Sequence, residues 1–139
     1  MNSPLAAVGT LLVNPQGEIL LGKRSNTHAP FWALPGGKMA LGETFEQTAS
    51  RELFEETAIS IQHWQLIGLT NNIATYRSEG LHFIVAILTA TNVTQQPKLC
   101  EPHRCKQWQW FKPSQLPEPL FEGTEQAIYN WLSRQFYQS

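Results

Sequence analysis

Cysteine is scarce in this sequence, and its scarcity limits the covalent and metal cross-links that could hold the fold together. Among 139 residues there are two cysteines, Cys100 and Cys105. The four residues between them include His103, and this group supplies too few ligands for a complete zinc site. A disulfide between them is the less favoured alternative, and we expect two free thiols.

Long apolar runs and an excess of charge are also missing. No run approaches the ~20 apolar residues of a membrane-spanning helix. Residues 1–13 lack the basic segment that opens a signal peptide, and their apolar residues suit a strand better. The formal net charge of −1 gives no bulk attraction to nucleic acid or to an anionic membrane. We therefore expect a cytoplasmic protein with neither a nucleic-acid nor a membrane partner.

The composition is that of a globular protein. Hydrophobic residues make up 42% of the chain and charged residues 15%, values that are not typical of disordered chains. A chain of 139 residues is long enough to bury a sizeable core. We expect one domain over residues 1–139.

Acidic residues are concentrated in one segment, residues 37–59. Thr44 can cap a helix that begins near Glu43, with Gln47 completing a capping box. No Pro or Gly interrupts this segment between Glu43 and Thr57. An apolar stripe that can pack on a core follows the same helix, at Phe45, Ala49 and Leu53. Five of the eleven acidic residues of the chain lie in the segment, namely Glu43, Glu46, Glu52, Glu55 and Glu56.

Three of these carboxylates are predicted to converge. Glu52, Glu55 and Glu56 have the i, i+3, i+4 spacing of one helix face. Like charges at this spacing destabilise a helix by a few tenths of a kcal/mol per pair, roughly, and only Arg51 lies nearby to offset them. A divalent cation with hard oxygen ligands, Mg²⁺ or Mn²⁺, would remove the conflict. From spacing alone, an acidic solvent-facing helix is an equally good interpretation.

The full pattern around these residues favours the metal site. Gly37, Glu43 and the run Arg51-Glu52-Leu53-x-Glu55-Glu56-x-x-Ile59 resemble the Nudix box of MutT-type hydrolases. One position departs from the box, because Ala58 stands where the family usually has Gly. Helices commonly end on a left-handed residue, and Ala there costs about 1 kcal/mol unless the helix ends by another geometry. This departure touches no expected metal ligand.

The resemblance implies a fold and a set of site residues. The fold is an α/β/α sandwich with a mixed central sheet. The metal ligands are the Gly37 carbonyl, Glu52, Glu55 and Glu56, and Glu101 in the polar loop of residues 91–106 is a further candidate. The catalytic candidates are Glu52 and Glu55, with Glu52 favoured as the proton acceptor, while Glu43 and Arg51 support the site. The candidate substrate-binding residues are Lys23 and Arg24 for phosphate and Asn72 and His82 for the base.

Apolar periodicity and turn residues predict the remaining elements. We expect a hairpin over residues 5–24, whose strands flank the turn at residues 14–17. Further strands are expected at residues 59–70, 73–76, 81–90 and 107–111. A final helix over residues 122–136 is expected to cover the sheet on the side opposite the acidic helix.

The resemblance also implies an activity. Similarity over most of residues 5–122 is to small Nudix hydrolases that cleave nucleoside triphosphates to a nucleoside monophosphate and pyrophosphate. Oxidised or otherwise modified purine nucleotides are included among the expected small-molecule substrates. One alternative is hydrolysis of NADH, ADP-ribose or another nucleoside diphosphate derivative, and another is a catalytically silent nucleotide-binding module. Because relatives are often dimers, a homodimer is a further expectation.

Overall fold

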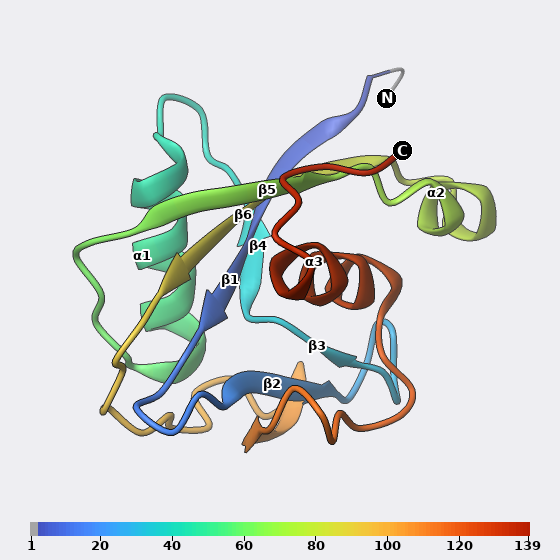
Figure 1. The fold of residues 1–139 in the computed structure, drawn as a ribbon. Coiled ribbons are helices and arrows are strands. Elements are labelled where there is room, and N and C mark those ends of the chain that lie inside the picture. Colours follow the sequence, from blue (N-terminus) through green and yellow to red (C-terminus); the bar gives the residue numbers. More distant parts are fainter. Residues whose placement is uncertain (1–2) are drawn as a thin grey trace.

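The computed structural model describes residues 3–139, so the first two residues of the expected domain lie outside the described part. It contains two β-sheets and three helices (Figure 1). The strands are β1 (Leu5–Leu12), β2 (Ile19–Arg24), β3 (Trp32–Ala33), β4 (Gly36–Lys38), β5 (Gln65–Thr70), β6 (Phe83–Ala90) and β7 (Cys105–Phe111). The helices are α1 (Phe45–Thr57), α2 (Ile73–Glu79) and α3 (Glu122–Leu132).

The central sheet has four strands in the order β4-β1-β6-β5. Strands β1 and β6 are parallel and pair from Leu5 opposite Phe83 to Leu12 opposite Ala90. The outer strands β4 and β5 are antiparallel to their neighbours. The prediction of a mixed central sheet is therefore confirmed. The parallel pair is buried in the middle of the sheet, where both faces are covered by helices.

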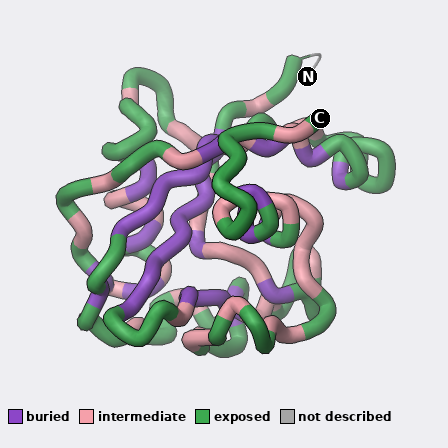
Figure 2. Tube along the Cα trace, viewed as in Figure 1, coloured by how far each residue is buried: buried purple, intermediate pink, exposed green. Residues whose placement is uncertain are grey.

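The two faces of this sheet carry different helices because side chains alternate along a strand. Val8 and Leu88 face one side and share a core cluster with Ala49 of α1. Leu11 faces the other side and shares a cluster with Ile128 of α3. Figure 2 shows the resulting buried strands between the two more exposed helices. The α/β/α sandwich and the position of the last helix are confirmed, although that helix ends at Leu132.

The expected hairpin over residues 5–24 is wrong. The turn at residues 14–17 forms, with the Asn14 carbonyl accepting from Gly17 N at 2.9 Å. Beyond an isolated bridge between Val13 and Ile19, however, the two strands diverge. Both edges of β1 are taken by β4 and β6, so β2 pairs instead with β3 and β7 in a second, three-stranded sheet. A strand has only two edges, and the long-range pairing with β6 takes the edge that a hairpin would need.

Two other strand predictions need correction. The segment expected as a strand at residues 73–76 is the first part of α2, which is capped by Gly80 in the left-handed region, with φ of 77°. The strand expected at residues 59–70 covers only Gln65–Thr70. Ile59 is apolar because it packs in the core that α1 shares with β2, rather than in a strand. The strands expected at residues 81–90 and 107–111 are observed with shifted ends.

Two further findings concern membranes and thiols. In the described part of the chain no helix has the length and apolarity needed to cross a bilayer. Cys100 is exposed and Cys105 is buried, and both are free thiols, as predicted.

Candidate active site

Helix α1 begins and ends as its sequence predicts. The Thr44 hydroxyl accepts a hydrogen bond from Gln47 N at 3.1 Å, and the Gln47 side chain accepts one from Thr44 N at 2.9 Å. This is a complete capping box. At the other end Ala58 is left-handed with φ of 63°, and its N–H donates to the Phe54 carbonyl at 2.9 Å. Alanine therefore takes the strained conformation that glycine would adopt more readily.

Arg51 organises the carboxylates of α1. Its guanidinium binds both oxygens of Glu43, through Nε at 2.7 Å and a terminal nitrogen at 2.9 Å. Its other terminal nitrogen lies 2.9 Å from Glu52 Oε1 and 3.2 Å from Glu55 Oε1. Hydrogen bonds from Arg51, the Ala40 N–H and the Thr48 hydroxyl lower the pKa of Glu43 to about 2. Glu43 is thus ionised at neutral pH and anchors Arg51, which in turn orients Glu52 and Glu55.

Gly36 and Gly37 of β4, here called the glycine loop, bring the backbone close to these carboxylates. Gly36 N donates to Glu56 Oε1 at 3.0 Å. A Cβ atom on Gly37 would collide with the carboxylate of Glu52, and one on Gly36 would collide with the Val8 carbonyl. At Gly36 the obstacle is backbone, so a side chain there would push the strand off the sheet, whereas a side chain at Gly37 would displace the carboxylate of Glu52.

Burial makes two of the carboxylates hard to ionise. Burial raises the pKa of Glu56 to about 8, against the opposing hydrogen bond from Gly36 N–H, and the charges of Glu52 and Glu101 raise it further. Burial also raises the pKa of Glu52, while Arg51 lowers it. A group of carboxylates held this close is destabilised at neutral pH unless positive charge is added.

Glu101 belongs to this group although it lies far away in the sequence. It lines a small recess together with Glu56, Arg104 and Trp108. The loop that carries it is tied to the end of α1 by a hydrogen bond from Lys98 N to the Thr57 carbonyl, at 2.9 Å.

The carboxylate oxygens of Glu52, Glu55 and Glu56 suit a hard divalent cation, although in this structure they accept hydrogen bonds from other groups. Within residues 3–139, no three Asp, Glu, His or Cys side chains are grouped closely enough to hold one ion as they stand. Glu52 and Glu55 bind Arg51, and Glu56 binds Gly36 N–H. Carboxylate and carbonyl oxygens are the ligands that Mg²⁺ prefers. Because Arg51 contacts Oε1 of Glu52 and Oε1 of Glu55, a cation that takes these two oxygens would displace its guanidinium.

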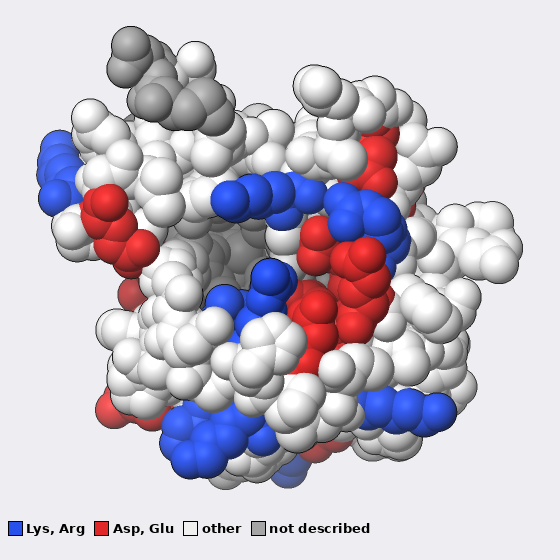
Figure 3. All heavy atoms as spheres, turned by 180° about the vertical axis from the view of Figure 1, so that it is seen from behind, with Lys and Arg blue, Asp and Glu red and all other residues white. Residues whose placement is uncertain are grey.

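A cavity of about 410 Å³ opens beside the carboxylates. Figure 3 shows the hollow on this face of the molecule, flanked by acidic side chains on one side and by basic side chains around it. The volume lies within the range of small-molecule sites. Its ionisable lining residues are Arg24, His28, Lys38, Glu52, Glu56 and Arg104.

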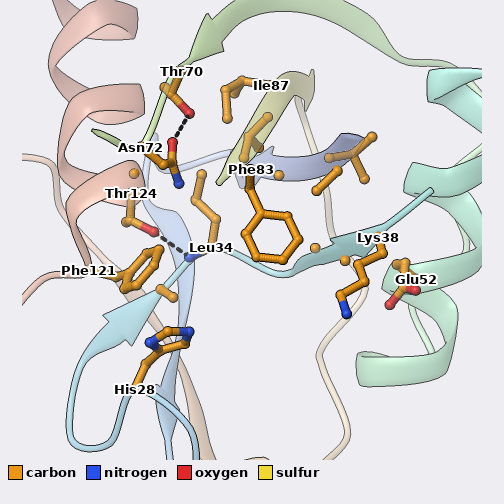
Figure 4. Close-up of a pocket in the computed structure, with 18 of the residues that line it drawn as sticks. His28, Leu34, Lys38, Glu52, Thr70, Asn72, Phe83, Ile87, Phe121 and Thr124 are labelled. Carbon is orange, nitrogen blue, oxygen red and sulfur yellow. Dashed lines mark hydrogen bonds between the residues drawn. The ribbon is translucent and has the colours of Figure 1, made fainter. Parts of the chain in front are cut away.

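The far part of the cavity is aromatic and polar. In Figure 4 the Phe83 ring projects into the cavity between Asn72 on one side and Lys38 and Glu52 on the other. Lys38 Nζ lies 5.7 Å from the centre of the Phe83 ring. Phe121 and His28 form another part of the wall, with ring centres 4.7 Å apart.

The structure brings some of the predicted site residues together and separates others. Arg24, Gly37, Glu52, Glu56 and Asn72 line the cavity, and Glu101 lines the adjoining recess. Three others lie outside the lining of the cavity. Glu55 is on the exposed side of Arg51, Lys23 Nζ lies 6.0 Å from the ring centre of Trp32, and His82 packs beside Tyr76 with ring centres 5.5 Å apart.

Sequence reasoning missed several lining residues. Lys38 follows Gly37 directly, so its place beside the glycine loop was a signal that could have been used. The others carry no local signal, because they reach the cavity only through tertiary packing. They are His28, Thr75, Phe83, Arg104, Phe121 and Thr124.

Comparisons with known proteins agree with this geometry. The family profile described as NUDIX domain matches residues 3–132. The RNA pyrophosphohydrolase of Acinetobacter baylyi is 31% identical over 118 residues, which cover 74% of this chain and 70% of that protein. The crystal structure of a MutT NUDIX hydrolase from Burkholderia pseudomallei matches with a TM-score of 0.85 and 31% identity, over 92% of this chain and 98% of that one.

A third protein extends the comparison. The MutT protein from Methanosarcina mazei matches with a TM-score of 0.75 and 25% identity, over 96% of each chain. The family profile spans nearly all of the described residues, and it includes the glycine loop, α1 and all of α3. This chain therefore belongs to the Nudix family of MutT-like hydrolases and is an enzyme of the pyrophosphohydrolase type.

Proposed function

We propose that the chain is a Mg²⁺-dependent pyrophosphohydrolase of (deoxy)nucleoside triphosphates, including oxidised or otherwise modified purine nucleotides. The products are a nucleoside monophosphate and pyrophosphate. One observation carries this proposal: a single cavity has carboxylates and cations at one end and an aromatic, hydrogen-bonding wall at the other. A triphosphate and a nucleoside would occupy these two ends.

The proposed metal ligands are Glu52, Glu55, Glu56, Glu101 and the Gly37 carbonyl, and Mn²⁺ can replace Mg²⁺. When bound, the cation neutralises phosphate charge and lowers the barrier to attack at phosphorus. The raised pKa of Glu56 supports this assignment, since positive charge next to a buried carboxylate favours its ionised form.

Side chains of this chain would position the reaction. Glu52 accepts a proton from the attacking water, and Glu55 is the second candidate for this role. The water oxygen forms a bond to phosphorus while the bridging P–O bond breaks and pyrophosphate leaves. Arg51 lies 2.9 Å from Glu52 Oε1 and would orient this carboxylate until a cation takes that oxygen. Arg24, Lys38 and Arg104 line the cavity and would bind the phosphates as cations.

The proposed substrate contacts follow the lining of the cavity. Arg24 and Asn72 keep the roles expected for them, and Lys38 and Phe83 join them. Lys23 and His82 lie outside the lining, so we assign them no direct contact.

A second candidate substrate is the triphosphorylated 5′ end of RNA. The name of the Acinetobacter relative, with 31% identity, supports it. Such a substrate would present the same triphosphate to the carboxylates, with the rest of the strand leaving through the mouth of the cavity. NADH and ADP-ribose would present a diphosphate to the same carboxylates, and a silent module would bind a nucleotide there without cleaving it.

A substrate panel with Mg²⁺ tests the proposal. It contains unmodified nucleoside triphosphates, 8-oxo-dGTP, NADH, ADP-ribose and 5′-triphosphorylated RNA, and the released pyrophosphate and orthophosphate are measured separately. We expect one pyrophosphate per nucleoside monophosphate, and loss of turnover when EDTA removes the metal. Release of orthophosphate, or turnover of RNA or ADP-ribose alone, would overturn the assignment. Binding of nucleotide without any turnover would establish the silent module instead.

A further inference from the structure

Helix α2 is capped by a residue from another helix. Asn72 precedes α2 in the left-handed region, with φ of 55°, and within residues 3–139 its side chain makes no capping hydrogen bond. The carboxylate of Glu122, at the start of α3, takes this role. It accepts from Ala74 N and Thr75 N, each at 2.9 Å, and from the Thr75 hydroxyl at 2.8 Å. These bonds fix α2 to α3, since first-turn amides need an acceptor.

The start of α3 is itself fixed to the floor of the cavity. Phe121 N donates to the Trp32 carbonyl at 2.9 Å. The Thr124 hydroxyl accepts from Leu34 N at 3.0 Å. Phe121 and Thr124 thus tie the start of α3 to the segment of residues 32–34, and Glu122 ties it to α2.

The Asn72 side chain is held in one orientation next to the contact between α2 and α3. The Thr70 hydroxyl donates to Asn72 Oδ1 at 2.7 Å, and Nδ2 points into the cavity (Figure 4). Gly123 leaves the space for Nδ2, because a Cβ atom there would lie 2.6 Å from it. Asn72 and Glu52 lie on opposite sides of the cavity with Phe83 between them. A nucleotide with its phosphates at Glu52 would therefore present its base to Asn72.

We propose that Glu122 is a positioning residue for base selection, and that the Asn72 amide it helps to place favours bases with a carbonyl oxygen over bases with an amino group. This inference rests on the proposed function. The physical reason is the direction of the hydrogen bond: Nδ2 is a donor, so an amino group opposite it leaves two donors facing each other and unpaired. Sites built to hydrogen-bond one substrate discriminate strongly against an analogue that leaves those groups unpaired.

Two matched pairs of substrates test the inference with the wild-type protein. ITP and ATP differ at position 6 of the purine, and UTP and CTP differ at position 4 of the pyrimidine, in each case by a carbonyl in place of an amino group. We expect kcat/KM to be larger for the carbonyl member by roughly ten- to a hundredfold. The difference should lie mainly in KM, because the contact is remote from the reacting phosphorus.

Three variants assign the effect to residues. Asn72→Asp replaces the donor by an acceptor in nearly the same shape, so we expect the carbonyl preference to disappear or reverse. Glu122→Gln weakens the cap of α2 and should reduce the carbonyl-to-amino ratio by about threefold or more, with kcat kept. Glu125→Gln is the matched control, since Glu125 is exposed on the same first turn of α3. It should behave as wild type.

The outcomes separate this inference from the proposed function. No turnover of any nucleoside triphosphate would refute the function, whereas turnover without a carbonyl preference would refute only the inference. An Asn72→Asp variant that changes both members of a pair equally would also overturn it. A Glu122→Gln variant with wild-type thermal stability and an unchanged ratio would remove Glu122 from base selection. If Glu122→Gln fails to fold, Thr75→Val is the alternative, because it removes one hydrogen bond to Glu122. An unchanged carbonyl-to-amino ratio in Thr75→Val would then refute the role of Glu122 in base selection.

Discussion

The two ends of the cavity are built in different ways. They are called here the phosphate end, near Glu52 and Glu56, and the base end, near Asn72, after the proposed position of a nucleotide. At the phosphate end the glycine loop and α1 come from one continuous segment, in which Gly36 N binds Glu56 across 20 residues. At the base end Asn72, Phe83 and Thr124 come from separate segments, and the contact that joins α2 to α3 spans 48 residues, from Ala74 to Glu122. The difference suggests that one local segment supplies the carboxylates proposed to act on the phosphates, whereas tertiary packing brings together the residues proposed to select the base. Substitutions at the first end should then act on kcat, and those at the second on KM.

The largest effect is expected for Glu56→Gln, at the phosphate end. Loss of this buried carboxylate should lower kcat by at least about a hundredfold, because a charged ligand of the proposed metal is removed. The fold should survive, since a neutral side chain suits this buried position better than a charged one. Steady-state kinetics and thermal unfolding measure the two properties. The control is Glu46→Gln, an exposed position on the same helix, and wild-type kcat in Glu56→Gln would remove Glu56 from the site.

Gly37→Ala tests the close approach at the same end. The added Cβ would collide with the carboxylate of Glu52, so Glu52 must move. We expect kcat to fall by roughly tenfold to a hundredfold, with a small change in KM. Kinetics on one nucleoside triphosphate decide the outcome, and a change confined to KM would contradict the proposed role of Glu52.

Gly123→Ala is the matched substitution at the base end. Its Cβ would lie 2.6 Å from Asn72 Nδ2 and should displace that amide. We expect KM to rise by about tenfold while kcat changes little, since the reacting phosphate is remote from this contact. Equal losses of kcat in Gly37→Ala and Gly123→Ala would break the proposed division between the two ends.

Ala58→Gly should change stability without changing activity. Because Ala58 has a φ of 63°, glycine should relieve strain and stabilise the protein by about 1 kcal/mol. This corresponds to a rise in Tm of roughly 3 °C for a chain of this size. Ala40→Gly, at an exposed position outside the left-handed region, is the control and should not stabilise. A large change in kcat in Ala58→Gly would show that the helix end takes part in the reaction.

The smallest effect concerns the pH dependence of the Glu43 anchor. The pKa of Glu43 is lowered from 4.5 to about 2 in the folded protein, so its ionised form stabilises the fold. That contribution is complete above pH 4.5 and is lost as the pH falls from 4.5 towards 2. The Tm difference between wild type and Glu43→Gln should be greatest near neutral pH and should close over this interval. A Tm difference that does not change with pH would show that ionisation of Glu43 does not contribute to the stability of the fold.

The sequence predicted helix α1 and its cap because these signals are short-range. Thr44 and Gln47 are three residues apart, and the spacing of Glu52 and Glu56 on one helix follows from the helical repeat. The strain at Ala58 could also be anticipated, since a left-handed residue often ends a helix.

The base end could not be predicted in the same way. Ile73, Thr75 and Tyr76 favour a strand by propensity, but the distant carboxylate of Glu122 supplies the cap that makes the segment helical. The expected hairpin failed for a related reason. The turn at residues 14–17 is correct, yet the pairing of β1 with β6 decides where β2 goes. Local sequence carries no information about which distant strand occupies an edge.

The contacts of Arg51 have a consequence for the response of the enzyme to metal. Its guanidinium and the proposed cation compete for the same oxygens of Glu52 and Glu55, while Glu43 keeps the displaced side chain nearby. Under the proposed function, Arg51 would be an internal counter-ion for Glu52 and Glu55 whenever no cation is bound. Linkage then requires that the cation weakens the contacts of Arg51 with these carboxylates, and that these contacts weaken cation binding. The protein would exchange one positive charge for another at Glu52 and Glu55.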